Sequence, residues 1–251
     1  MKMKWSEMTD QLPDSKNSIG QIEIKDLFDN YPIADPLRGV NLILKKGQIT
    51  CLLGDSCSGK STIVNLLERR HNYSQGSICV NGKELKELNK KNWLSKVTIV
   101  PRSTFYSHKT IADNIAAKSC TTEEEANVVA FCKVYGFHSY ITKLKKGYKT
   151  VVGNAPLALT EAQSQLIALA RALYPCPDVL VLNESTTAMD FRMERHALDI
   201  LHRIKEHMII LLITGRPKVA YRSDYVYLLN DGLITKKGEP EAITDALERL
   251  I

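Results

Sequence analysis

The sequence lacks an apolar stretch long enough to cross a membrane as a helix. Its longest uninterrupted apolar run is Met208–Ile213, whereas a membrane-spanning helix needs about 20 such residues. Met1–Pro13 mixes acidic and basic side chains, unlike the apolar core of a secretory signal peptide. We therefore expect a soluble chain located in the cytosol.

The sequence also lacks the spacings that mark structural metal sites and disulfide frameworks. Its six cysteines include no C-x-x-C pair. Scattered cysteines in a chain of 251 residues are typical of free thiols in a reducing compartment. His202 and His207 are too far apart in sequence to share one face of a helix. The pattern therefore argues against a zinc site.

The charge is not concentrated in one segment. The formal net charge is +6 and the pI is about 8.9, values that suit nucleic acid or an anionic surface. The lysines, however, occur in short clusters along the whole chain, which favours a solvated surface over a nucleic-acid groove. With 44% hydrophobic and 25% charged residues, the composition is that of a globular domain. We expect no nucleic-acid partner.

Strands and helices are predicted to alternate along the chain, which favours a mainly parallel, doubly wound α/β sheet. Buried strands are expected at 48–53, 179–182 and 208–213, and alternating strands at 22–24 and 40–44. Asn81-Gly82 and Asn230-Asp231-Gly232 predict two hairpins. Helices are expected at 63–67, 192–204, 240–251 and 122–135, the last opened by a capping box of Thr122 with Glu125.

A phosphate-binding loop is the strongest motif. Between a predicted strand and a predicted helix, residues 54–61 match the pattern G-x-x-x-x-G-K-[ST]. Glycines let consecutive backbone N–H groups point at phosphate oxygens, while Lys60 adds charge at the β- and γ-phosphates and the Ser61 hydroxyl can ligate magnesium. The predicted nucleotide-binding residues here are Gly54, Asp55, Ser56, Cys57, Ser58, Gly59, Lys60, Ser61 and Thr62.

Cys57 is unusual within this loop. If its position requires a positive φ, a cysteine there is strained. An oxidisable thiol is the alternative interpretation, and a plain loop residue is favoured over it.

From Gln21 onward the chain resembles the ATP-binding cassette of ABC exporters. The residues that carry the resemblance, besides the phosphate loop, are Asn30–Pro32 (A-loop), Val100–Ile115 (Q-loop and the helix after it), Val151–Gly153 (X-loop), Leu159–Leu173 (signature helix), Val179–Glu184 (Walker B), Thr187–Asp190 (D-loop), and Asp231-Gly232 with Gly238.

The resemblance implies the architecture and the partners. It implies a RecA-like phosphate-loop NTPase core with an antiparallel β subdomain and a helical subdomain at about 103–172. The cassette is expected to span residues 21–251, and residues 1–20 to be a linker from a transmembrane domain. ATP and Mg²⁺ are the implied cofactors. A transmembrane domain of the same or a partner chain and a second cassette, in a homo- or heterodimer, are the implied partners at the cytoplasmic face of the cell membrane.

The resemblance also assigns roles to single residues. Tyr31 is expected to stack on adenine, although a packing tyrosine in a turn is the alternative. Glu184 aligns with the general base and, with Lys60, is the predicted catalytic residue. Ser61 and, more weakly, Asn183 are the predicted metal ligands.

Four motifs depart from the family's pattern, and we expect these departures to slow hydrolysis. Arg102 replaces a glutamine, Asn183 the Walker B aspartate and Gly215 the switch histidine. In place of the signature L-S-G-G-Q, residues Leu159–Gln163 read L-T-E-A-Q. Glu161 in this segment would face the partner's γ-phosphate. At ~5 Å and an effective dielectric constant of about 20, that repulsion is about 3 kcal/mol per unit charge. Neutral variation in a working ATPase is the less favoured alternative.

Arg102 is also a candidate nucleotide-binding residue. We hypothesise that its guanidinium partly replaces the metal's charge beside the γ-phosphate. ATP binding would then depend little on magnesium.

Several functions fit these observations. The favoured one is a degenerate, partner-dependent exporter cassette with weak or absent hydrolysis; peptide or bacteriocin export is the suggested substrate class. The alternative is a non-hydrolysing, nucleotide-gated scaffold or regulator. A DNA-associated ABC ATPase is disfavoured because the stretch between Thr62 and Leu159 has no sustained heptads. A phosphate-loop kinase would leave the signature-like helix unexplained.

Overall fold

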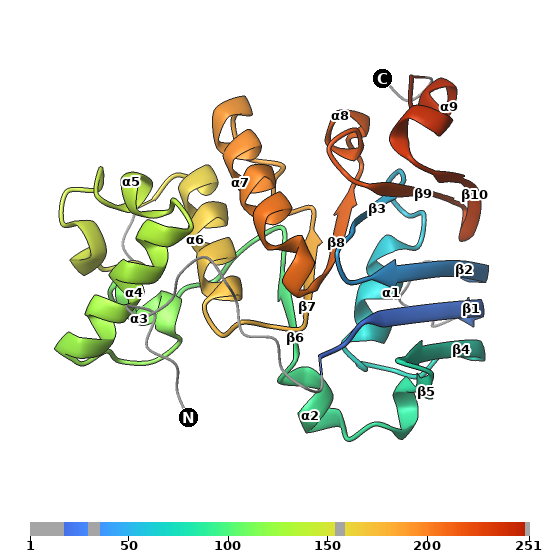
Figure 1. Ribbon diagram of the computed structural model, residues 1–251, viewed down its shortest axis with the longest axis horizontal. Helices are drawn as coiled ribbons and strands as arrows, with labels where there is room; N and C mark the ends of the chain where they lie inside the picture. The colour runs from blue at the N-terminus through green and yellow to red at the C-terminus, as the bar shows by residue number, and fades with distance from the viewer. Residues whose placement is uncertain (1–17, 30–35, 154–158, 249–251) are drawn as a thin grey trace. The chain divides into compact units, whose positions relative to one another are not determined.

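A computed structural model describes residues 18–29, 36–153 and 159–248. They form two compact units. The sheet-containing unit holds residues 18–29, 36–99, 177–184 and 201–248. The helical unit holds residues 100–153, 159–176 and 185–200. Figure 1 labels the helices and strands of each unit.

The sheet-containing unit begins with a four-stranded antiparallel sheet of order β2-β1-β4-β5. Alternate side chains of β1, among them Ile22 and Ile24, are buried, as expected for a sheet with one face on the core. Asn81 and Gly82 both have positive φ values and connect β4 to β5, which confirms the predicted hairpin. The strands are β1 (Gln21–Asp29), β2 (Leu37–Lys45), β4 (Gln75–Val80) and β5 (Lys83–Glu84).

A six-stranded sheet of order β10-β9-β3-β8-β7-β6 forms the second layer of this unit. Strand β3 pairs in parallel with β8 and β9, and β7 pairs in parallel with β8, whereas β10 is antiparallel to β9. Every residue of β3 and β8 is buried, which explains their uninterrupted apolar sequences. The strands are β3 (Ile49–Leu53), β6 (Val97–Val100), β7 (Val179–Asn183), β8 (Ile209–Thr214), β9 (Tyr225–Asn230) and β10 (Leu233–Gly238).

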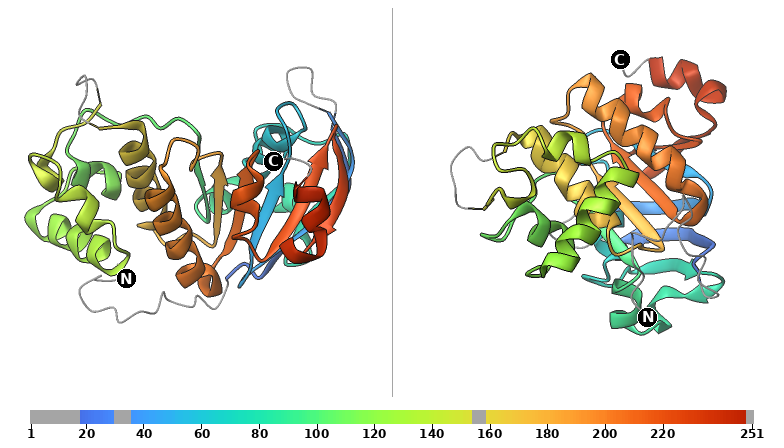
Figure 2. Two further views of the ribbon diagram at one scale, coloured as in Figure 1. Left: turned by 90° about the horizontal axis from the view of Figure 1, so that it is seen from above. Right: turned by 60° about the vertical axis from the view of Figure 1, so that its left-hand side comes forward.

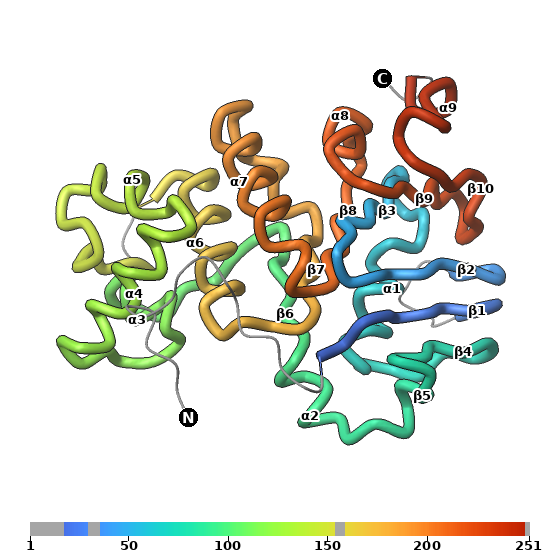
Figure 3. The backbone as a smooth tube through the Cα atoms, in the orientation of Figure 1, coloured from blue at the N-terminus to red at the C-terminus, as the bar shows by residue number. Residues whose placement is uncertain are grey.

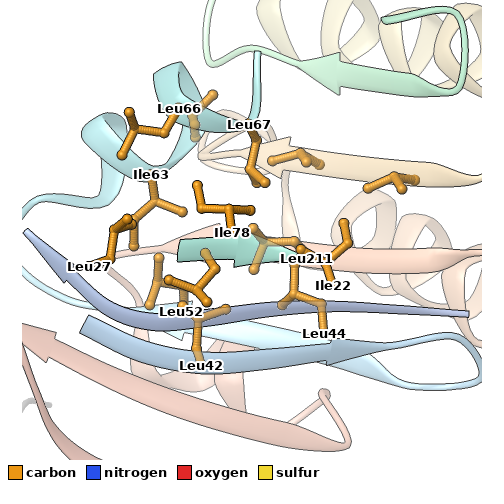
Figure 4. Packing of buried hydrophobic residues seen from close by; sticks show 14 of the residues in the cluster. Ile22, Leu27, Leu42, Leu44, Leu52, Ile63, Leu66, Leu67, Ile78 and Leu211 are labelled. Atoms are coloured by element: carbon orange, nitrogen blue, oxygen red, sulfur yellow. The ribbon is translucent and has the colours of Figure 1, made fainter. Parts of the chain in front are cut away.

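Helix α1 joins the two sheets in one hydrophobic core. In Figure 4, Ile63, Leu66 and Leu67 of α1 lie in the same cluster as Leu27 of β1 and Leu52 of β3. All five side chains are at most 2% exposed. This core fixes the end of β3 against the start of α1, where the phosphate-binding motif lies.

Short helices complete the sheet-containing unit. Trp93 of α2 is buried, and its Nε1 donates to the carbonyl oxygen of Leu67 at 2.6 Å, which ties α2 to the end of α1. The helices are α1 (Lys60–Leu67), α2 (Lys90–Leu94), α8 (Pro217–Ala220) and α9 (Thr244–Glu248), with 3₁₀ turns η2 (Leu85–Glu87), η4 (Lys205–His207) and η5 (Pro240–Ile243). The predicted helix 240–251 is thus a 3₁₀ turn followed by α9, and its last three residues lie outside the described part.

The helical unit packs around Phe131 of α4, whose ring lies within 6 Å of the rings of Tyr135, Phe137 and Tyr174. Buried Asn114 of α3 holds the loop before that helix through bonds to the backbone and hydroxyl of Ser107. Figure 2 shows these helices from two further directions. They are α3 (Ile111–Ala116), α4 (Thr122–Val134), α5 (His138–Ile141), η3 (Gly147–Lys149), α6 (Glu161–Leu173) and α7 (Phe191–Ile204), the last divided between the two units at Ile200.

The predicted capping box of α4 is wrong by one residue. Thr121, not Thr122, accepts the backbone N–H of Glu124, and Glu124 accepts the backbone N–H of Thr121. Both threonines have a glutamate three positions later, so the spacing alone did not distinguish them.

None of the helices in the described part of the chain combines the length and the apolar character that a bilayer crossing requires.

Candidate nucleotide-binding site

The phosphate-binding motif lies where the sequence predicts it, between β3 and α1 (Figure 3). We refer to residues 54–61 as the phosphate loop. Buried β3 ends at Leu53, and α1 begins at Lys60 with Gly59 as its N-cap. Because no side chain caps α1, its first backbone N–H groups are suited to an anion, which the helix dipole also favours.

Two glycines allow this loop to pack closely against its surroundings. A Cβ atom on Gly54 would lie 2.3 Å from the carbonyl oxygen of Leu229, too close for any side chain. Gly59 has a φ of 103°, and a Cβ atom there would lie 2.7 Å from Leu37 Cδ2. Backbone bonds from Gly54 N to Thr214 O and from Gly232 N to Ser58 O attach the loop to β8 and to the β9–β10 turn. The loop is therefore held from both sides.

Lys60 lies across the loop rather than in solvent. Its ammonium donates to the carbonyl oxygens of Gly54 at 2.7 Å and Asp55 at 2.5 Å, and to Ser58 Oγ at 3.3 Å. The side chain is 5% exposed. These bonds fix a positive charge beside the start of α1, so a phosphate that reaches the loop meets a cation already in place.

Cys57 has a φ of 62° and is exposed at the tip of the loop. The position therefore does require a positive φ, and the cysteine occupies the left-handed region of backbone conformation. That conformation costs a residue with a Cβ atom about 1–2 kcal/mol relative to glycine. Asp55, Ser56 and Ser61 are also exposed, whereas Ser58 and Thr62 are buried.

Adjacent parallel strands bring further predicted residues to this edge of the sheet. Asn183 ends β7 opposite Ile213 of β8, and Thr214 pairs with Leu53 of β3. Since parallel strands present their carboxyl ends at one edge, Asn183 and Glu184 lie on the same side of the sheet as the phosphate loop. Glu184 has a φ of 52°, and its N–H donates to the carbonyl oxygen of Ile213 at 2.9 Å, so its backbone is fixed.

Gly215 follows β8 directly beside the phosphate loop. A Cβ atom on it would meet Gly54 O at 3.5 Å, an ordinary contact, and its φ lies outside the left-handed region. A cavity of about 70 Å³ opens there, lined by Leu53, Gly54, Asp55, Gly215, Leu228, Leu229, Asn230 and Thr235. Neither backbone conformation nor crowding therefore requires glycine at this position.

The available oxygen donors fit a magnesium ion held mainly by phosphate. Ser61 is exposed on the first turn of α1, and Asn183 is half-buried at the end of β7. Both offer neutral oxygens, whereas Mg²⁺ prefers carboxylates and usually keeps several waters. Among the described residues, no group of three or more His, Cys, Asp or Glu side chains is arranged to hold a metal ion. The site therefore suits a metal that arrives with a nucleotide.

The signature-like segment opens α6 in the helical unit. Thr160 Oγ1 accepts the N–H of Gln163, and Gln163 Oε1 accepts the N–H of Thr160, a complete capping box. Thr160 is therefore the N-cap of α6. Exposed Glu161 is the first residue of α6, so a carboxylate already lies at the positive end of this helix.

Not every predicted residue is placed with the phosphate loop. Arg102 is exposed and belongs to the helical unit, and Tyr31 lies outside the described residues. Gln165, which no sequence motif indicated, is a buried residue of α6 whose side-chain amide bonds the backbone at Arg102 and at Ala188. A polar residue on the buried face of a predicted helix is the signal that would have indicated it.

A parallel sheet with a glycine-rich loop leading into a helix defines a phosphate-loop nucleotide-binding domain. The family model described as "ABC transporter" matches residues 37–187, and the chain belongs to this family. It is 34% identical to an ATP-dependent lipid A-core flippase of Saccharophagus degradans, over 90% of this chain and 39% of that protein. It is 31% identical to a leukotoxin export ATP-binding protein of Aggregatibacter actinomycetemcomitans, over 89% of this chain and 32% of that protein.

The chain thus spans well under half the length of these relatives. A solved structure of a bacterial Atm1-family ABC exporter with ATP bound superimposes with a TM-score of 0.83 at 24% identity, over 95% of this chain and 44% of that one. This similarity shows the fold, a phosphate-loop NTPase core with parallel and antiparallel sheets, as the sequence predicts.

Proposed function

We propose that this chain is the ATP-binding domain of an ABC exporter, and that it couples ATP binding with weak hydrolysis to export through a partner. The observation that carries the proposal is the phosphate loop, in which Lys60 is held by two carbonyl oxygens beside an uncapped helix start. That arrangement suits the β- and γ-phosphates of a nucleotide. In this role Lys60 and residues 54–62 bind ATP, and Tyr31 stacks on the base.

Weak hydrolysis follows from the side chains around the loop. Glu184 provides a carboxylate that can accept a proton from water. Asn183 offers no negative charge to a metal, and Gly215 offers no side chain to the terminal phosphate. Bound Mg²⁺ would neutralise charge developing on the phosphate oxygens. Because phosphoryl transfer depends on positioning and charge stabilisation, these two substitutions lower the rate more than the affinity.

The proposed partners are a transmembrane domain, encoded in the same or another chain, and a second cassette. Residues 1–20 would lead from the former, residues 21–251 would form the cassette with a helical part at about 103–172, and the assembly would lie at the cytoplasmic face of the membrane. Relatives named for export of a toxin and for flipping a lipid support an export direction. Glu161 at the start of α6 favours an asymmetric pair of cassettes, since a homodimer would repeat its charge at both sites.

Titration with a fluorescent ATP analogue, followed by steady-state ATPase assays, tests this proposal. We expect binding with slow turnover that rises when a partner cassette is added.

The double variant Asn183→Asp, Gly215→His is expected to raise turnover at least tenfold, because the cavity beside Gly54 has room for a side chain. Asn127→Asp, a matched substitution on α4 of the helical unit, is the control. Failure of the wild-type chain to bind ATP would refute the proposal.

Magnesium dependence tests the role of Arg102. If its guanidinium offsets the γ-phosphate charge, EDTA changes the ATP affinity of the wild-type chain little, and Arg102→Gln restores a dependence on magnesium. A collapse of wild-type affinity on chelation would exclude this role.

The same assays address the alternative function, a nucleotide-gated scaffold. A scaffold binds ATP with the same loop but shows no ATP turnover with any partner cassette. Stimulated turnover therefore separates an exporter domain from a scaffold.

A further inference from the structure

Gln165 is a buried amide whose two polar groups bind two different loops. It lies on α6 and is 1% exposed. Its Nε2 donates to the carbonyl oxygen of Arg102 at 3.1 Å, and its Oε1 accepts the N–H of Ala188 at 3.2 Å. Losing either bond would leave a buried polar group without its partner, which is costly. The side chain is therefore confined to a geometry that serves both loops at once.

The first of these loops, residues 101–106, lies along α6 and is held to it at three points. Besides Gln165, Arg171 of the same helix donates to the carbonyl oxygen of Phe105 at 2.9 Å, and its guanidinium lies 5.1 Å from the centre of the Tyr106 ring. The Tyr106 hydroxyl donates to the carbonyl oxygen of Ser164. Gln165 and Arg171 are separated by about 9 Å along the helix axis. We call residues 101–106 the Arg102 loop.

The second loop, residues 185–190, directly follows Glu184 and is called the Ala188 loop. It is a tight turn, with a backbone bond from Met189 to Thr186, and Asp190 accepts the N–H of Met193 at the start of α7. The Ala188 N–H points to Gln165 instead of into this turn. One amide on α6 thus connects the backbone at Arg102 to the backbone at Ala188, in the loop that follows Glu184.

We propose that Gln165 is a positioning residue that makes the Arg102 loop and the Ala188 loop respond together when nucleotide binds. The proposal rests on the function given above, in which the chain binds ATP. A shift of either loop changes one Gln165 bond, and the rigid amide transmits it to the other bond. Helix α6, which begins at Glu161, moves with them.

Two substitutions test whether the two bonds are needed. Gln165→Glu keeps both, because burial favours the protonated carboxyl, whose O–H can donate to Arg102 O while its other oxygen accepts Ala188 N–H. Gln165→Met keeps the length and loses both. Gln75→Glu, the same chemical change at an exposed position of β4, is the control. Hydrogen exchange of residues 101–106 and 185–190 with and without ATP, ATP affinity and thermal unfolding are measured for each variant.

In the wild-type chain and in Gln75→Glu, ATP is expected to slow exchange in both loops. In Gln165→Met we expect the Ala188 amide to exchange about tenfold faster, and ATP to slow exchange in only one of the two loops. Gln165→Glu is expected to keep slow exchange in both loops and their common response to ATP. Because glutamate and methionine are of similar size, this difference between the two variants is not expected of a residue that only fills space.

Two results would overturn the inference: a wild-type response of both loops to ATP in Gln165→Met, or a uniform acceleration of exchange along the chain that follows the loss of thermal stability. If the wild-type chain does not bind ATP, the proposed function fails instead. The nucleotide-free exchange of Gln165→Glu and Gln165→Met then still decides whether the two loops are linked through Gln165.

Discussion

A Cβ atom on Gly215 would lie 3.5 Å from the carbonyl oxygen of Gly54, whereas a Cβ atom on Gly54 itself would lie 2.3 Å from the carbonyl oxygen of Leu229. Two neighbouring glycines of the candidate site are therefore constrained very differently. Gly54 is required by the close approach of β9, and Gly215 has room for a side chain beside a cavity of about 70 Å³.

Gly54→Ala is expected to destabilise the chain by about 1–3 kcal/mol, because the methyl group forces the loop away from β9. Gly215→Ala is expected to change the free energy of unfolding by less than about 0.5 kcal/mol. Urea unfolding of the two variants and the wild-type chain measures both. Equal destabilisation by the two substitutions would contradict the described geometry.

Lys60→Met is expected to weaken ATP binding at least tenfold, since hydrogen bonds to charged groups contribute about 1.5–3 kcal/mol each. Isothermal titration gives the change in affinity. Lys83→Met, which removes an exposed lysine of β5, serves as the control and should bind ATP as the wild type does. An unchanged affinity of Lys60→Met would remove Lys60 from the nucleotide site.

Thiol labelling should distinguish Cys57 from Cys51, Cys120, Cys132 and Cys176. Cys57 is exposed, whereas burial raises the pKa of Cys51 and of Cys132 to about 12 and of Cys120 and Cys176 to about 11. Since the thiolate is the nucleophile, these four thiols should label slowly at pH 7.5 in the folded chain. A chromogenic disulfide reagent followed by peptide mapping measures the rates.

ATP is expected to protect Cys57 from this reagent, and Cys57→Ser should abolish the part of the fast labelling that ATP suppresses. Labelling of Cys57 at the same rate with and without saturating ATP would argue against nucleotide at the phosphate loop.

Asp113 should make the stability of α3 depend on pH. Burial alone would raise its pKa, but hydrogen bonds from Cys120 N and from the Thr110 hydroxyl and N–H outweigh it, and its pKa is lowered. A folded pKa below the unfolded value means that the stabilisation is present above the unfolded pKa. It is lost as the pH falls through the folded pKa.

Asp113→Asn is therefore expected to cost about 1 kcal/mol at pH 7, a typical capping contribution, and progressively less below about pH 4. Urea unfolding from pH 7 to pH 2.5 follows the difference from the wild type. Asp245→Asn, an exposed first-turn aspartate of α9, is the control. A difference that does not shrink on acidification would show that the Asp113 carboxylate is not the stabilising group.

The sequence predicted the features that depend on local pattern. The buried strand, glycine loop and helix at 48–67 were predicted because the glycines and the spacing of apolar residues can be recognised in a single sequence. The sequence left open whether Cys57 has a positive φ, which the structure shows. The capping box of α4 was placed one residue late because two threonine–glutamate pairs compete.

Features made by segments distant in sequence were not predicted. The cavity beside Gly215 and the bridge through Gln165 both depend on how strands and loops pack. A periodicity identifies a buried side but not the partner that covers it. Packing, and not local propensity, decides these contacts.

Strand β3, which ends in the phosphate loop, pairs on one side with β8 and on the other with β9, so that Ile49 lies opposite Ile210 and Thr50 opposite Tyr225. During synthesis on the ribosome both neighbours emerge long after the loop itself. Closing such non-local parallel pairings is slow, since much chain must be ordered before any contact forms. The nucleotide pocket is therefore among the last parts of the sheet-containing unit to mature, and a nascent chain that stops before β8 presents the motif without a working site.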